Sequence, residues 1–298
     1  MKQKVIIFGA GNAGMAAKNN LHSDYQIIAF CDNDPQKSGL EIDGIPIVSV
    51  KELHNLNYDV IMIASEYFEQ IETQLKQQEN IAEKKIKVLH ATAMKRFHFG
   101  DSDLTKQVCE EVLLALCDAL TESGIKYYVD AGTLLGIYRD DAFIPWDDDF
   151  DIAVLRDDIE KIRSNQGTLL TALERVSNQP WKITEYYAEQ AFGLVKAGDT
   201  RSFKLEPTDA NCQLPLIDLF VKYVDQHVMD YVIASRGFSM PSRHMLQLAS
   251  FTFRDKSIFI PSDVEGYLSR HYGDWQTPKS DWTLDDIQSS TLYDEKTL

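Results

Sequence analysis

The sequence predicts an α/β protein of two parts: an N-terminal domain built on a parallel sheet (residues 1–100) and a C-terminal α+β domain (residues 101–298). Three observations support this. Strand-like and helix-like runs alternate up to about residue 97, the pattern breaks at residues 99–103, and a long amphipathic helix then opens a new pattern. With 298 residues, 44% of them hydrophobic and 26% charged, the chain is long enough for two cores.

In the first part, the apolar run at residues 4–8 predicts a buried strand, which is followed by a glycine-rich turn and a helix through about residue 21. The turn at residues 32–35 ends a second strand at residues 26–30. Further strands are expected at residues 45–48, 59–64 and 86–89, with helices at residues 49–53 and 66–77 between them. This alternation is typical of a parallel sheet covered by helices.

The glycine-rich turn has the spacing Gly9-x-Gly11-x-x-Gly14, directly after a strand and at the start of a helix, which is the context of a Rossmann-like nucleotide-binding turn. Its backbone N–H groups can approach a diphosphate at the positive end of the helix. Asp32 closes the next strand, where an acidic residue can accept ribose hydroxyls. The domain is about one mononucleotide-binding half and shows no proton-relay set, so hydride chemistry is not expected. Binding of a nucleotide or nucleotide-sugar and a purely structural role both stay open.

Residues 5–14, 30–35 and 44–48 resemble the N-terminal Rossmann-like domain of bacterial sugar-modifying acyltransferases. In that family the domain holds a UDP-sugar, so the resemblance implies a nucleotide-sugar module. The sequence lacks the hexapeptide repeats of those enzymes, and acyl transfer is therefore not implied.

In the second part, apolar residues four positions apart predict a helix over residues 104–121, with Ser102 or Asp103 as its N-cap and Gly124 at its end. A strand at residues 125–129, a helix opening at Gly132 and Thr133, and a strand at residues 150–154 are expected next. Later patterns predict helices at residues 157–177 and 224–236 and short strands at residues 191–195, 216–221 and 258–260. Their order in a sheet is left open.

Charge and cysteine usage restrict the functions that the chain can have. The chain has 30 basic and 46 acidic residues, a net charge of -16, whereas proteins that bind phosphate backbones are usually basic. Residues 1–100 hold 11 basic and 12 acidic residues, so the excess negative charge belongs to the second part. Cys31, Cys109, Cys117 and Cys212 form no C-x-x-C pair, which is typical of thiols in a reducing compartment. No nucleic-acid partner is expected.

The longest apolar runs, such as residues 60–64, are far shorter than the roughly 18 residues of a membrane span. The apolar stretch near the N-terminus is also shorter than the about 7 residues that a secretory signal needs. We therefore expect a cytoplasmic protein without a transmembrane segment, and the sequence leaves its oligomeric state open.

An acidic run, Asp147-Asp148-Asp149-Phe150-Asp151, carries the strongest chemical signal. Alternate residues of a strand share a face, so Asp147, Asp149 and Asp151 could project together. Such carboxylates repel one another unless a cation lies between them, and hard oxygen ligands suit Mg²⁺ or Mn²⁺. Interleaved apolar residues place the run against a core. Together with the helix start at Gly132 and Thr133, which can receive a phosphate, the run predicts phosphoryl-group chemistry.

Five segments resemble, in the same order, the LicD family, which includes the fukutin-related proteins and has a nucleotidyltransferase-like fold. They are residues 134–139, 144–152, 216–220, 253–261 and 267–275. Pro-Trp-Asp-Asp-Asp-x-Asp combined with Tyr-Gly-Asp-Trp is specific, and the resemblance covers residues 104–282. It implies transfer of a phospho-alcohol, such as phosphocholine or an alditol or glycerol phosphate, from a CDP-linked donor to a glycan hydroxyl. The acceptor would be a surface polysaccharide or its lipid-linked precursor, which would bring the protein to the inner membrane face as a peripheral protein.

The resemblance also implies roles for single residues. Gly132 and Thr133 would lie at the donor phosphates, Asp149 and Asp151 would hold the metal, and Asp218 would be the third catalytic carboxylate on a neighbouring strand. Asp147 matches the family pattern as a further metal ligand, and Arg139 matches it as a substrate-binding residue. Lys196, Arg201 and Lys204 precede the strand of Asp218, and their positive charges could meet a diphosphate. His244 and His271 are lone histidines, which we interpret as structural.

Two other functions are compatible with these residues. The same carboxylates could activate an α-phosphate, which would make the protein a nucleotidyltransferase that releases pyrophosphate. Alternatively, the chain could be a non-catalytic nucleotide-sugar binding protein that works through Gly9, Gly11 and Gly14. The released product separates the first alternative from phospho-alcohol transfer, and the dependence of binding on Asp149 and Asp151 separates the second.

Overall fold

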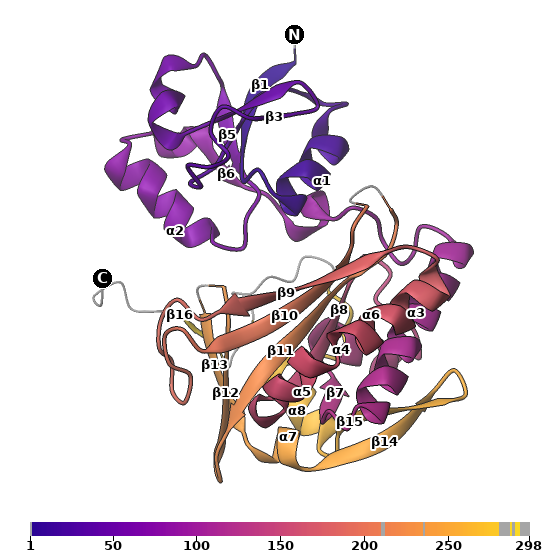
Figure 1. Cartoon of the computed structure of the whole chain (residues 1–298). Helices are drawn as coiled ribbons and strands as arrows, with labels where there is room; N and C mark the ends of the chain where they lie inside the picture. The colour runs from indigo at the N-terminus through magenta and orange to yellow at the C-terminus, as the bar shows by residue number, and fades with distance from the viewer. Residues whose placement is uncertain (1, 210–211, 235, 280–286, 288–289, 293–298) are drawn as a thin grey trace. The chain divides into compact units, whose positions relative to one another are not determined.

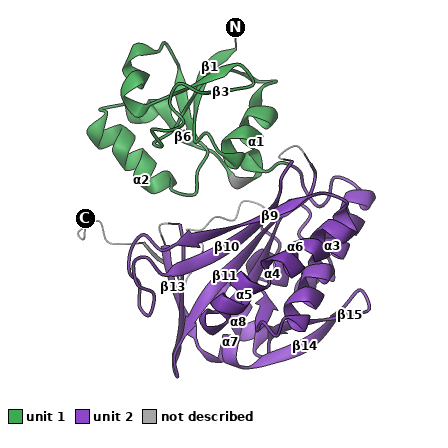
Figure 2. Cartoon of the chain, viewed as in Figure 1, with its two compact units in different colours: residues 1–96 green, residues 97–298 purple. Residues whose placement is uncertain are grey.

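The computed structural model describes residues 2–209, 212–234, 236–279, 287 and 290–292. The chain forms two compact units, residues 1–96 and 97–298 (Figure 2). Among the described residues, no helix combines the length and the hydropathy needed to cross a bilayer. Each unit has its own sheet and its own hydrophobic core.

Unit 1 is a parallel sheet with strand order β3-β4-β2-β1-β5-β6, in which only the two-residue edge strand β3 runs antiparallel to its neighbour. The strands are β1 (Gln3–Phe8), β2 (Tyr25–Cys31), β3 (Glu41–Ile42), β4 (Ile45–Val48), β5 (Val60–Ile63) and β6 (Ile86–Val88). The helices are α1 (Asn12–Leu21), η1 (Val50–Asn55), α2 (Phe68–Thr73), η2 (Gln74–Gln78), η3 (Glu83–Lys85) and η4 (Ala91–Met94). The predicted Rossmann-like parallel sheet is confirmed.

The central strand β1 is buried on both faces, because alternate side chains enter different cores. Val5 and Ile7 pack in one cluster with Ala17 of α1, whereas Ile6 and Phe8 pack in another cluster with residues of α2 and η2. A strand covered on both sides has a continuous apolar sequence rather than an alternating one, which is why the sequence alone predicts this strand.

Unit 2 contains an eight-stranded mixed sheet. Strands β16-β13-β12-β11-β10-β9 follow one another, β8 pairs in parallel with β11, and β7 pairs antiparallel with β8. The strands are β7 (Tyr127–Val129), β8 (Asp149–Leu155), β9 (Trp181–Tyr187), β10 (Thr200–Pro207), β11 (Leu216–Val224), β12 (Val228–Ile233), β13 (Arg236–Pro241) and β16 (Ser290–Leu292). A separate hairpin is formed by β14 (Leu248–Phe253) and β15 (Lys256–Pro261).

In unit 2, α3 lies against α6, α6 against β9, and α4 against β8 (Figure 1), whereas α7 and α8 contact β15 of the hairpin. They are α3 (Asp103–Glu122), α4 (Ala131–Asp140), η5 (Arg156–Asp158), α5 (Ile159–Ser164), α6 (Gln166–Ser177), α7 (Arg243–Leu246) and α8 (Val264–Tyr272). Ser102 caps α3 by accepting the Thr105 N–H, as predicted. The α+β character of this part is confirmed.

The predicted helix at residues 224–236 is wrong, because this segment forms the turn and strand of a β11–β12 hairpin and the start of β13. The side chain of Asp225 accepts the N–H groups of His227 and Val228, which makes a tight turn. The β-branched and aromatic residues that follow suit a strand. Apolar spacing alone does not register this turn, so the segment resembles a helix in sequence.

Other expected elements differ in detail. The helix expected at residues 157–177 is divided into η5, α5 and α6, with a break at Asn165. The strand expected at residues 191–195 is only an isolated bridge between Phe192 and Val195, and the helix expected at residues 49–53 is the 3₁₀ helix η1. Strands β3, β9, β10, β13, β14 and β16 were not predicted, and β12 falls within the segment that was predicted as a helix. Cys31, Cys109 and Cys117 are buried, whereas Cys212 is half-buried.

His244 is buried at 1% exposure, and its ring packs edge-on against Tyr267. Burial, together with the positive charges of Arg243 and Arg270 and against the opposing effect of Asp263, lowers the pKa of His244 to about 4. His271 is buried as well, and burial lowers its pKa to about 4. Both histidines are therefore neutral parts of the core.

We expect the free energy of unfolding to fall as the pH is lowered from about 6.5 toward about 4, and the substitution His244→Gln to make this fall shallower. Within this window the unfolded chain binds a proton at His244 and the folded chain does not, so lower pH favours unfolding. Urea denaturation at several pH values measures the slope. The exposed His22→Gln is the control, and an equal change of slope in both variants would contradict the assignment.

Candidate active site

The pairing register of three neighbouring strands brings acidic and basic side chains together. Asp149 and Asp151 lie on one face of β8, since alternate residues of a strand point the same way. In the parallel pairing, Asp151 is opposite Asp218 of β11. In the next, antiparallel pairing, Asp218 is opposite Lys204 of β10, and Lys204 Nζ lies 3.4 Å from Asp218 Oδ2. Asp151, Asp218 and Lys204 thus form a row across the sheet.

The turn before β8 adds further carboxylates. Oxygen atoms of Asp147, Asp148 and Asp149 can all lie within 4.8 Å of one another. Asp148 was not predicted, because strict alternation would turn it to the opposite face. The strand begins only at Asp149, however, so alternation does not apply to the two residues before it. The signal that would have identified Asp148 is the end of the turn, which extends through this residue.

The electrostatics of the cluster are dominated by Asp151. Burial, followed by the negative charges of Asp149, Asp147 and Asp218, raises the pKa of Asp151 well above its usual value. A buried carboxylate surrounded by other carboxylates is stabilised in its ionised form by a cation between them. Hard carboxylate oxygens are the ligands that Mg²⁺ and Mn²⁺ prefer, so the donor set fits a divalent cation.

The start of α4 lies beside these carboxylates. Thr133 Oγ1 accepts a hydrogen bond of 2.9 Å from the N–H of Asp151. A Cβ atom placed on Gly132 would lie 2.8 Å from Asp147 Oδ2 and 4.0 Å from Asp151 Oδ2. Gly132 and Thr133 therefore lie at the positive end of a helix and next to the acidic groups.

Two residues that were predicted to bind the substrate, Arg139 and Lys196, do not lie beside the acidic cluster. Arg139 is in the last turn of α4, where it pairs with Asp140 and donates to the carbonyl oxygen of Trp275 at 3.1 Å. Lys196 is exposed in the loop between β9 and β10, and its N–H donates to Asp199. The structure brings Lys204 into the row of charges, but it places Arg139 and Lys196 outside that row.

A second candidate region is the glycine turn of unit 1. A Cβ atom on Gly14 would lie 1.8 Å from the carbonyl oxygen of Gly9, and Gly9 itself has a φ of +114°. A Cβ atom on Gly11 would meet nothing within 4 Å. Gly14 is therefore required by the close approach of α1 to the end of β1, Gly9 is required by its positive φ, and the space around Gly11 is open.

Asp32 stands beside this turn and is engaged by the protein. Its Oδ2 accepts the N–H of Ala10 at 2.8 Å and Lys37 Nζ at 2.9 Å, and its Oδ1 accepts the N–H of Asp34 at 2.9 Å. Burial acts to raise the pKa of Asp32, but the hydrogen bonds from Lys37, Asp34 and Ala10 outweigh it and lower the pKa overall. Asp32 thus closes the glycine turn, whether or not a ribose contacts it.

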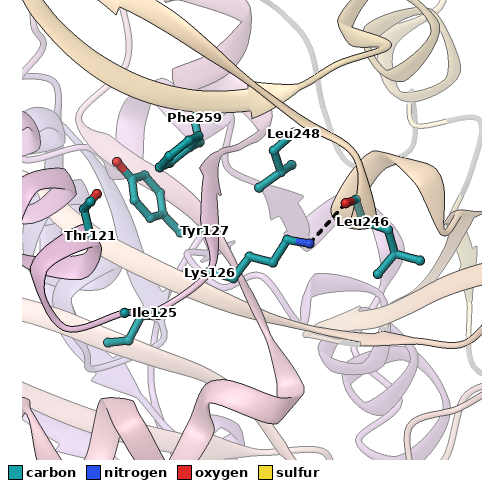
Figure 3. Close-up of a pocket in the computed structure, with 8 residues that line it drawn as sticks. Thr121, Ile125, Lys126, Tyr127, Leu246, Leu248 and Phe259 are labelled. Atoms are coloured by element: carbon teal, nitrogen blue, oxygen red, sulfur yellow. Dashed lines mark hydrogen bonds between the residues drawn. The ribbon is translucent and has the colours of Figure 1, made fainter.

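Unit 2 also has an open cavity of about 410 Å³ near the start of β7, shown in Figure 3. Lys126 Nζ donates to the carbonyl oxygen of Leu246 at 3.1 Å across it. The lining residues are Thr121, Gly124, Ile125, Lys126, Tyr127, Leu246, Leu248 and Phe259. The carboxylates lie near the other end of β7, where Val129 pairs with Ile152. This cavity is therefore separate from the acidic cluster.

We expect Gly132→Ala to leave unit 2 folded and to lower turnover about 10-fold or more, because a methyl group there occupies space between the helix start and the carboxylates. The nearest atom, Asp147 Oδ2, is the end of a side chain that can rotate away, so the fold should tolerate the change. Steady-state kinetics and thermal unfolding measure the two effects. Gly167→Ala, where a Cβ atom meets nothing within 4 Å, is the matched control. Equal turnover in both variants would contradict this placement.

Comparison with known families agrees with the motifs. Residues 124–263 match the family described as LicD/FKTN/FKRP, nucleotidyltransferase domain, and residues 1–87 match the family described as C2185-like, N-terminal. The predicted LicD resemblance of the second part is confirmed.

The uncharacterized protein RT0683 of Rickettsia typhi (strain ATCC VR-144 / Wilmington) is 46% identical over 160 residues, which is 53% of this chain and 43% of that protein. The uncharacterized protein RP689 of Rickettsia prowazekii (strain Madrid E) is 26% identical over 163 residues, 53% of this chain and 51% of that protein. The chain spans about half the length of these relatives.

Among solved structures, UDP-D-quinovosamine 4-dehydrogenase from Vibrio fischeri is 27% identical, with a TM-score of 0.26, over 30% of this chain and 76% of that chain. An oxidoreductase from Thermotoga maritima (TM0312) is 13% identical, with a TM-score of 0.27, over 97% of this chain and 93% of that chain.

Proposed function

We propose that this chain, in which residues 124–263 are a LicD/FKTN/FKRP nucleotidyltransferase domain, is a metal-dependent transferase that moves a phospho-alcohol from a CDP-linked donor to a glycan hydroxyl. The family domain suggests a phosphotransferase-like role in glycan or cell-surface biosynthesis. The observation that carries the proposal is the register of β8, β11 and β10, which aligns Asp151, Asp218 and Lys204 in front of the start of α4.

In the proposed reaction, the acceptor hydroxyl oxygen attacks the β-phosphorus of the donor. The bond from that phosphorus to the oxygen bridging it to the α-phosphate breaks, and CMP leaves with the electron pair. The hydroxyl proton passes to a carboxylate, and Asp218 would either accept this proton or ligate the metal. Thr133, the N–H groups at the start of α4 and Lys204 would hold the phosphates in place.

The residues that would hold Mg²⁺ or Mn²⁺ are Asp147, Asp149, Asp151 and Asp218, with Asp148 within reach of the same cluster. The cation would neutralise charge on the phosphate oxygens. The excess negative charge of the second part supports this requirement, because a phosphorylated donor without a cation would be repelled. A lipid-linked acceptor would place the protein at the inner membrane face as a peripheral protein.

Thermal unfolding with a ligand panel tests the proposal without an acceptor. The panel contains CDP-choline, CDP-ribitol, CDP-glycerol, CMP, UDP-sugars and NAD, each with and without Mg²⁺, on the wild type and Asp149→Asn. A ligand at about 100 times its Kd adds roughly 2.7 kcal/mol, a shift of several degrees. A Mg²⁺-dependent shift with one CDP-alcohol that is lost in the variant supports the proposal and names the donor. A shift only with UDP-sugars or NAD, unchanged in the variant, would contradict it.

The reaction product separates the two enzyme hypotheses. Phospho-alcohol transfer releases CMP from the CDP-linked donor, whereas nucleotidyl transfer releases pyrophosphate from a nucleoside triphosphate. We expect CMP.

For unit 1, the open position at Gly11 favours a second function, binding of a nucleotide or nucleotide-sugar. This binding should survive Asp149→Asn and be weakened by a bulky residue at Gly11, for example Gly11→Leu. Direct titration of both variants with UDP-sugars and NAD measures it, and binding unaffected by Gly11→Leu would exclude the glycine turn as the site.

A further inference from the structure

A buried ion pair lies next to the candidate active site, because Asp130 is hydrogen-bonded to the backbone of Asp151. Asp130 is 1% exposed and Lys222 is 0% exposed, and Lys222 Nζ lies 2.8 Å from Asp130 Oδ2. The same ammonium group lies 3.1 Å from the centre of the Tyr231 ring, and the Tyr267 hydroxyl donates to Asp130 Oδ1. None of these four residues was predicted to take part in the site.

Asp130 connects the sheet to the start of α4. Its N–H donates to the carbonyl oxygen of Asp151 at 2.9 Å, and its own carbonyl oxygen accepts the N–H of Leu134 at 2.9 Å. Its side chain accepts the N–H of Ala131 at 2.8 Å, as the N-cap of the helix. Asp130 therefore holds both the strand that carries Asp151 and the first turn of the helix that carries Gly132.

Lys222 connects Asp130 to the strand that carries Asp218. It lies on β11, four residues after Asp218, so the two side chains point to the same side of the strand. The ion pair thus links the strand of Asp218 to the turn at residues 130–133.

The backbone of that turn is in an unfavourable conformation. Ala131 has a φ of +42°, in the left-handed region that residues other than glycine rarely adopt. Such a conformation persists only where the surroundings fix it, and it occurs preferentially at functional sites.

A buried ion pair is weak evidence for stability, because the cost of removing two charges from water offsets their attraction, and an apolar pair of similar volume is often as stable. The position of the Asp130–Lys222 pair between α4 and β11 therefore says more about its role than its contribution to stability does. We infer that the Asp130–Lys222 pair is a positioning element of the active site, which fixes the turn at residues 130–133 so that Gly132 and Thr133 face the carboxylates of β8 and β11. This inference rests on the function proposed above.

The decisive variant is the double substitution Asp130→Asn/Lys222→Met, which removes both charges and leaves the net charge unchanged. Each single variant leaves one buried charge unpaired and should lower Tm by about 10 °C. The double variant should recover most of this loss in Tm, while its kcat stays about 30-fold or more below that of the wild type. A pair that serves stability alone would recover kcat together with Tm, and a double variant with wild-type kcat would overturn the inference.

Ala131→Gly provides an independent variant with no change of charge. Glycine adopts the left-handed conformation without strain, so Tm should stay equal or rise, whereas the loosened turn should lower kcat about 10-fold. Unchanged kcat in this variant would also count against positioning by the turn.

Binding of Mn²⁺ alone, followed by the electron paramagnetic resonance signal of the free ion, keeps the inference separate from the choice of donor. We expect the Mn²⁺ Kd of the double variant to rise about 10-fold, because Thr133 no longer holds the N–H of Asp151 in place. A weaker Mn²⁺ affinity without transfer from any CDP-linked donor would refute the proposed function and leave the inference standing. Transfer with wild-type kcat and Kd in the double variant would refute the inference alone.

Discussion

Asp149→Asn should lower the release of CMP from the CDP-linked donor about 1,000-fold or more, while the protein remains folded. The carboxylate is next to Asp151 in the cluster and is one of the oxygen donors that fit a divalent cation. Asn has nearly the same shape, so the substitution removes charge and metal affinity but little packing. Steady-state kinetics with Mg²⁺ and far-UV circular dichroism measure the two properties.

The same substitution should raise the Tm of the metal-free protein or leave it unchanged, because it removes one of the negative charges that act on the buried Asp151. Addition of Mg²⁺ should then stabilise the wild type but not the variant. Asp255→Asn is the matched control, since Asp255 is exposed and has a φ of +62°, which Asn adopts readily. Wild-type activity of Asp149→Asn with Mg²⁺ would show that the acidic cluster is not the catalytic centre.

Gly14→Ala should destabilise unit 1 by about 3 kcal/mol or more, because the new Cβ atom would lie 1.8 Å from the carbonyl oxygen of Gly9, so backbone has to move. Gly11→Ala, only three positions away, should change the free energy of unfolding by less than about 1 kcal/mol, because a Cβ atom there meets nothing within 4 Å. Denaturant unfolding of the full chain, monitored by hydrogen exchange of β1 and α1, measures both.

This pair of variants also tests what the glycines are for. If Gly11→Ala is as destabilising as Gly14→Ala, the contact between a Cβ atom at position 14 and the carbonyl oxygen of Gly9 does not explain the loss of stability. If Gly11→Ala folds normally and weakens nucleotide binding, the turn is a ligand site as well as a packing device.

The sequence was most informative where one interaction dominates a segment. The run at Val5–Phe8 could be identified as a buried strand because both of its faces are covered. Asp149 and Asp151 could be placed together because alternation on a strand is a local rule. Lys204 was one of several candidate cations, and only the pairing of β10 with β11 distinguishes it from Lys196.

The sequence was least informative where the structure depends on distant partners. Lys222 lies on the same strand as Asp218, and its partner Asp130 precedes it by more than 90 residues. No local pattern joins two such residues. The hairpin after β11 was mistaken for a helix because the hydrogen bonds of Asp225 that make the turn are invisible to apolar periodicity.

The parallel pairing of β8 with β11 has a consequence for how unit 2 folds. Strands that are joined through a long intervening segment pair late, since the entropy of closing the loop is lost before their contacts form. The carboxylates of Asp151 and Asp218 therefore remain far apart in the early chain and repel one another only when the two strands meet. We therefore expect a divalent ion that binds the cluster to offset this repulsion only after the two strands have met, and so to slow unfolding more than it speeds folding.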